Sequence, residues 1–181
     1  MARRFLWLWL SWLSGLLVSD CQPRLPELKD IEKKQQAVAR LQKTEGPTGT
    51  NFLEAVFQLA RAEENFARKY PNHPQTPAFL FEAAQLYANY LGDPRKAIAL
   101  LEIIDQRFRR QSSVAPEALL FQAFIYENQL NDTARAREIY ERFLSYYPDD
   151  TLAEQARQAI KLLGKSPEEI LQEFLQKQPA P

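Results

Sequence analysis

Part of the chain occurs twice. Residues 81–108 recur as residues 120–147, a shift of 39 positions, and the two copies share small, aromatic and acidic side chains at matching places. The matched pairs are Ala84 with Ala123, Tyr87 with Tyr126, Asn89 with Asn128, Leu91 with Leu130, Asp93 with Asp132, Ala97 with Ala136 and Glu102 with Glu141. A repeat of this length is typical of solenoids, in which stacked units bury their apolar faces against one another.

The apolar residues follow a helical period through most of the chain. Between residues 51 and 70 they form one stripe of a helix, which ends at Tyr70 because Pro71 cannot continue the hydrogen-bond ladder. The same spacing predicts helices over residues 26–44, 51–70, 77–91, 94–109, 116–130, 133–146, 151–163 and 167–177. No useful stretch alternates with period two. We therefore expect an all-α fold with almost no strand.

Several helix ends carry recognisable capping residues. Asp93 precedes Pro94, and Ser166 precedes a proline with Glu169 three residues on, so each supplies a side-chain acceptor at an N-cap. Gly164 is expected to end the preceding helix. The small residues Ala97 and Ala136 are expected to be buried where paired helices cross.

The first twenty residues predict an exported protein. Arg3 and Arg4 form a positive start, and residues 5–18 are a short apolar run that is too short to span a bilayer. Residues 1–20 are therefore expected to be a signal peptide. The stretch from Leu17 to Cys21 resembles the lipobox of bacterial lipoproteins, which implies cleavage before Cys21 and acylation of its sulfur. Asp20 departs from the lipobox pattern, so an exported protein without lipid remains the alternative.

Composition excludes several classes of function. Lys and Arg total 23, as do Asp and Glu, so no net basic charge favours nucleic acid as a partner. The single cysteine forbids an internal disulfide. The only histidine, His73, lies in a proline-flanked connector without neighbouring metal ligands. No catalytic motif is present, and we expect no catalytic residue, metal, cofactor or small-molecule substrate.

The repeat resembles a tetratricopeptide repeat. Residues 92–98 (Gly-Asp-Pro-Arg-Lys-Ala-Ile) match its turn and second-helix start, and Ala136, Tyr140, Phe143 and Pro148 match later positions. The resemblance implies a short solenoid of helical hairpins with flanking helices. We expect a lipidated cysteine, linker and polar helix over residues 21–50, the repeat domain over 51–164, a capping helix over 165–178 and a disordered tail over 179–181.

A narrower resemblance comes from the ends of two helices. Residues 66–71 and 143–148 share an F-x-x-x-Y-P ending, which is similar to repeats of BamD-like lipoproteins and of periplasmic TolA-binding proteins. Residues 163–170 also resemble small repeat lipoproteins of the Bacteroidetes type. These families imply a scaffold at the outer membrane that works through protein contacts.

Repeat alignment predicts a groove for a protein partner on the concave side of the array. The residues expected to face it are Phe79, Glu82, Leu86, Asn89, Ala118, Phe121, Ile125 and Asn128. Asparagine side chains both donate and accept hydrogen bonds, so a peptide or helix backbone suits this surface. The alternative is that the helix over 26–44 or the final helix covers these residues as core.

The sequence thus favours a non-enzymatic scaffold, lipid-anchored on the periplasmic face of a bacterial outer membrane, that binds a protein in outer-membrane protein assembly or envelope maintenance. A soluble periplasmic accessory of an envelope or cell-wall complex is the alternative function.

Overall fold

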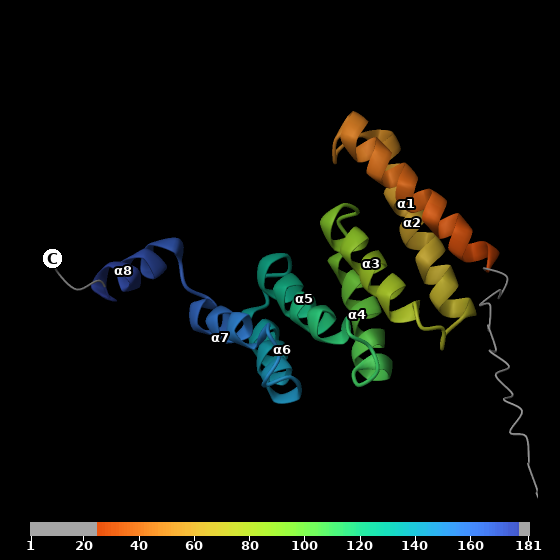
Figure 1. The fold of residues 1–181 in the computed structure, drawn as a ribbon. Helices are drawn as coiled ribbons and strands as arrows, with labels where there is room; N and C mark the ends of the chain where they lie inside the picture. Colours follow the sequence, from red (N-terminus) through yellow and green to blue (C-terminus); the bar gives the residue numbers. More distant parts are fainter. Residues whose placement is uncertain (1–24, 178–181) are drawn as a thin grey trace, which may run out of the picture.

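The computed structural model describes residues 25–177, and every regular element in that range is a helix. The helices follow one another with short connectors (Figure 1). They are α1 (Pro26–Glu45), α2 (Thr50–Lys69), α3 (Thr76–Asn89), α4 (Pro94–Phe108), α5 (Ala115–Asn128), α6 (Thr133–Tyr146), α7 (Ala153–Leu162) and α8 (Pro167–Lys177). The expectation of an all-α fold is confirmed.

The expected signal peptide over residues 1–20, the expected lipid site Cys21 and the expected tail over 179–181 lie outside the described residues. Within residues 25–177, no helix combines the length and the apolar character that crossing a membrane requires.

The predicted caps are present. Asp93 accepts a hydrogen bond from the backbone N–H of Lys96 at 2.9 Å, which begins α4. Ser166 and Glu169 cap α8 reciprocally, since each side chain accepts the other residue's backbone N–H, at 3.2 Å and 2.7 Å. Gly164 follows α7 with a φ of 80°, a left-handed conformation that glycine adopts without a steric penalty.

Successive helices pack against their neighbours from α1 through α7, which makes an extended array of helical hairpins consistent with a repeat protein (Figure 1). Ala97 in α4 and Ala136 in α6 have no exposed surface, and their hairpin partners α3 and α5 contribute the equally buried Ala84 and Ala123. The prediction that small residues are buried at these positions is confirmed. Small side chains let the two helices of a hairpin approach closely.

The two F-x-x-x-Y-P endings have matching structures. Phe66 and Phe143 are buried, and each contacts the tyrosine four residues later, with ring centroids 4.9 Å apart for Tyr70 and 5.4 Å for Tyr147. Both tyrosines directly follow their helices. This motif therefore ends a helix and anchors the following turn to the core.

The last helix stands apart from the array. α8 forms over the predicted residues but makes no extensive contact with any other helix, and Figure 1 shows it projecting beyond α7. Leu171 is 57% exposed and Leu175 is 59% exposed. The expectation that residues 165–178 form a capping helix stays a prediction, since a cap buries its apolar side chains against the last repeat and these two leucines are exposed.

Candidate functional site

The solvent-facing side of α5 is a stripe of four residues at helical spacing, Glu117, Phe121, Phe124 and Asn128. The repeat places Ala78, Glu82, Gln85 and Asn89 at the equivalent positions of α3, and these residues are also exposed or half-buried. The two helices therefore present matching faces to solvent, and the face of α5 is the more apolar of the two.

Three phenylalanines gather on this face. Phe81 of α3 meets Phe121 of α5 edge to face, with ring centroids 6.1 Å apart, and Phe121 stacks on Phe124 at 6.2 Å. Phe124 is 45% exposed. We call Phe81, Phe121 and Phe124 the apolar patch.

Four of the predicted groove residues lie elsewhere. Ile125 has no exposed surface, and Phe79, Leu86 and Ala118 are also buried. Phe79 packs on Phe66 of α2 with ring centroids 5.0 Å apart. The expectation that these four face an open groove is wrong, because they point into the contacts between successive hairpins.

The other predicted groove residues, Glu82, Asn89, Phe121 and Asn128, do lie on the solvent-facing stripes. The Asn128 side chain already donates a hydrogen bond to the backbone carbonyl of Phe124, at 3.2 Å. Repeat alignment missed Phe81 and Phe124. Glu117 and Asn128 are polar, and their helical spacing puts Phe121 and Phe124 on the same solvent-facing side of α5. That spacing could have identified Phe124 from the sequence.

α1 covers part of the equivalent face of α3. Gln35 of α1 donates a hydrogen bond to the Glu82 carboxylate at 2.9 Å, and Ile31 is fully buried against the array. The predicted alternative, in which the helix over 26–44 covers groove residues, therefore holds at Glu82. Phe124, in the part of the apolar patch on α5, remains open to solvent.

Beneath α1 lies a buried carboxyl group, Glu63 of α2. It has no exposed surface, and neither carboxyl oxygen has a hydrogen-bond partner in the described part of the chain. Burial, together with the nearby negative charge of Glu82, raises the pKa of Glu63 to about 10. Glu63 is therefore protonated at neutral pH, and its place under α1 makes it a structural group rather than an exposed acid or base.

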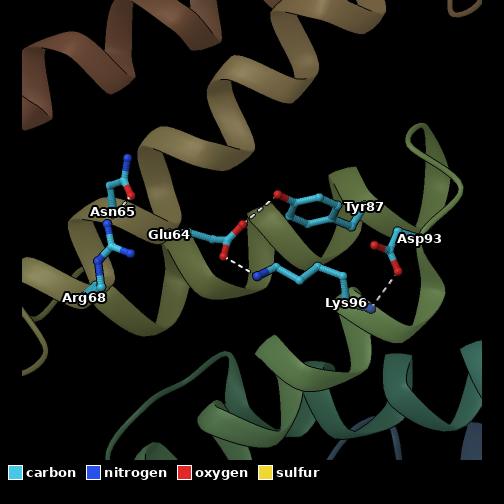
Figure 2. Close-up of polar contacts among 6 residues, drawn as sticks. All are labelled: Glu64, Asn65, Arg68, Tyr87, Asp93 and Lys96. Atoms are coloured by element: carbon cyan, nitrogen blue, oxygen red, sulfur yellow. Dashed lines mark hydrogen bonds and ion pairs between the residues drawn. The ribbon is translucent and has the colours of Figure 1, made fainter.

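A concave surface lies between α2 and α4, with α3 as its floor. It encloses about 740 Å³, and its apolar lining includes Phe57, Leu80, Leu100 and Ile103. Figure 2 shows its polar centre, where Tyr87 donates a 2.6 Å hydrogen bond to Glu64 and the Lys96 ammonium pairs with the same carboxylate at 2.6 Å. Burial and the hydrogen bond to Glu64 raise the pKa of Tyr87. We call this surface the α2/α4 groove.

Arginines surround the α2/α4 groove without carboxylate partners. Arg61, Arg68 and Arg107 form no ion pair with any residue in the described range 25–177. The Arg68 guanidinium donates a hydrogen bond to the side-chain oxygen of Asn65, at 2.8 Å. The Arg61 guanidinium lies over the Phe57 ring. The groove therefore carries surplus positive charge around an apolar floor.

His73 has a local structural role. Its Nδ1 accepts a hydrogen bond from the backbone N–H of Gln75 at 3.2 Å, and its ring meets Phe66 edge to face. Among the residues from 25 to 177, no cluster of three or more His, Cys, Asp or Glu side chains could hold a metal ion.

Comparison with protein-family models, with curated proteins and with solved structures finds no match to this chain.

Proposed function

We propose that this protein is a tetratricopeptide-type scaffold lipoprotein that holds a protein partner on the periplasmic face of the bacterial outer membrane. In this proposal Cys21 carries the lipid, no reaction is catalysed, and the partner belongs to outer-membrane protein assembly or envelope maintenance. The resemblance of residues 92–98 and of the F-x-x-x-Y-P endings to envelope repeat proteins supports the setting.

The observation that carries the binding role is the apolar patch. Phe124 exposes a large apolar side chain on α5, and Phe81 and Phe121 extend the patch across two hairpins. Large aromatic side chains dominate the free energy of many protein interfaces. Glu117 and Asn128 border the patch and supply the polar rim that such interfaces usually have.

The partner suited to this patch is an extended peptide or an amphipathic helix with apolar anchors. An apolar strip that runs from α3 to α5 accepts side chains spaced along such a segment. Asn89 and Asn128 at matching positions offer donors and acceptors to its backbone.

The test is co-purification from membranes through a C-terminal tag. Phe121→Ala combined with Phe124→Ala should remove the bound partner, and each truncation at a hot spot costs roughly 2 kcal/mol or more. Tyr146→Ala is the matched control, because Tyr146 is a 38% exposed aromatic residue on α6, outside both the apolar patch and the α2/α4 groove. Unchanged recovery of the partner by the double variant would contradict the assigned surface.

The unlipidated periplasmic accessory remains the second candidate function, since Asp20 departs from the lipobox pattern. The mass of the mature protein separates the two. Acyl chains on an N-terminal Cys21 support the lipoprotein, and an unmodified cysteine supports the soluble accessory.

A further inference from the structure

Two unpartnered features lie at opposite ends of the array. The α2/α4 groove, near the N-terminal end, has an apolar floor and three arginines without carboxylate partners in the described chain. α8, at the C-terminal end, exposes Leu171 and Leu175, and these are the most exposed of the large apolar side chains described. The arginines of the α2/α4 groove lack carboxylate partners, and the leucines of α8 lack an apolar surface to cover them.

The charges of the two features are complementary. The sequence of α8 holds three acidic residues, Glu168, Glu169 and Glu173, and one basic residue, Lys177. Glu168 lies on the same side of the helix as Leu171 and Leu175, because these three positions are separated by three and four residues. Arginine guanidinium groups favour carboxylate partners, often through two hydrogen bonds.

The length of α8 also matches the length of the α2/α4 groove. The residues of α2 that line the groove run from Phe57 to Arg68, a distance on the order of 16 Å along the helix axis. α8 has 11 residues and therefore a length of roughly 16 Å. A groove of about 740 Å³ is large enough for the side chains on one face of such a helix.

The α8 that occupies the groove must come from another molecule. Within one chain, α5, α6 and α7 separate α8 from the groove, as Figure 1 shows. The connector from Leu163 to Ser166 has four residues and reaches about 14 Å at most, so α8 cannot pass these helices without unfolding them.

We propose that α8 of one molecule docks in the α2/α4 groove of a second copy of this chain. The leucines of α8 cover the apolar floor, and its carboxylates pair with Arg61, Arg68 and Arg107. The contact joins two different surfaces, so two copies either exchange α8 reciprocally or associate head to tail. A single docked helix buries little area, so the association is weak and depends on concentration and salt.

The test is sedimentation equilibrium of residues 22–181, which retain every described helix, over a range of protein and salt concentrations. The wild-type protein should self-associate, and high salt should weaken this. The first double variant, Arg68→Glu with Arg107→Glu, should weaken self-association at least tenfold. The second double variant, Glu168→Lys with Glu173→Lys, should weaken it by a similar factor. The second variant leaves Glu169 and its cap intact.

Mixing provides the decisive measurement. The groove variant and the α8 variant should each be monomeric alone and should form a heterodimer when combined, because the acidic groove then meets a basic α8. Arg110→Glu with Arg137→Glu, at exposed arginines away from the groove, should self-associate like the wild type. A wild-type protein that stays monomeric at all concentrations, or a mixture that shows no association, overturns the proposal.

Discussion

The ring of Phe121 in α5 meets the ring of Phe81 in α3 at a centroid distance of 6.1 Å, across the boundary between two helical hairpins. Because Phe121 also stacks on the half-exposed Phe124, one aromatic cluster both joins the hairpins and faces solvent. The same side chains therefore contribute to the packing of the array and to an exposed apolar face.

The crossing of α5 and α6 should be sensitive to side-chain volume at Ala136. Ala136→Leu would overpack a position without exposed surface and should lower the free energy of unfolding by about 1–3 kcal/mol. Urea unfolding measures the change. Ala134→Leu, at an exposed position of the same helix, is the control and should change stability by no more than about 0.5 kcal/mol. Equal stabilities for the two variants would contradict close packing at Ala136.

The start of α6 should depend on its N-cap. Asp132 accepts a hydrogen bond from the backbone N–H of Arg135 at 3.0 Å, so Asp132→Ala should cost about 1 kcal/mol of stability. Thermal unfolding checks this value. Asp149→Ala removes an exposed aspartate that follows the same helix, and it should leave the midpoint nearly unchanged. If both variants unfold at the wild-type midpoint, the cap contributes nothing measurable.

The buried Glu63 should make stability fall as pH rises. Its pKa is raised from 4.5 to about 10 in the folded protein, so the folded state binds more protons than the unfolded state between these values. Glu63→Gln, which stays neutral, should therefore be more stable than the wild type at pH 8, by several kcal/mol. Near pH 4 the advantage should vanish, because Glu63 is then protonated in both states.

Urea unfolding at pH 4, 6 and 8 measures this dependence. Glu64→Gln is the matched control, because Glu64 is bonded to Tyr87 and Lys96 and its substitution should destabilise the protein at pH 8. A pH profile of Glu63→Gln parallel to the wild-type profile would show that Glu63 is not the group responsible.

Membrane attachment should require Cys21. Cys21→Ala should move the protein from the membrane fraction to the soluble periplasmic fraction, because stable anchoring by lipid needs two or more acyl chains and this is the only cysteine. Fractionation after a high-salt wash measures the distribution. Retention of the variant in the membrane fraction would place the anchor elsewhere.

Helix positions followed from local sequence alone. The 3.6-residue period of apolar side chains, the acceptors Asp93 and Ser166 at helix starts, and Gly164 after α7 each act within a few residues, so no tertiary information was needed. The repeat added the pairing of helices and the burial of Ala97 and Ala136.

Which helix face meets solvent depended on tertiary structure. Phe79, Leu86 and Ile125 are as apolar as Phe121 and Phe124, and apolar character alone does not distinguish them because all five lie on strongly apolar helices with little amphipathic contrast. The packing of the neighbouring hairpins buries the first three and leaves the other two accessible. The α2/α4 groove likewise combines residues from three helices, so no local pattern could indicate it.

The sequence by itself determined that this chain is helical, where its helices begin and end, and that its central hairpins repeat, because these properties arise from contacts between residues close along the chain. Only the tertiary structure decided which apolar side chains are core, that Glu63 is buried beside Glu82, and that α8 stands free. Those outcomes depend on the angles and offsets at which successive helices pack. Many weak contacts between residues distant in sequence together determine these angles and offsets.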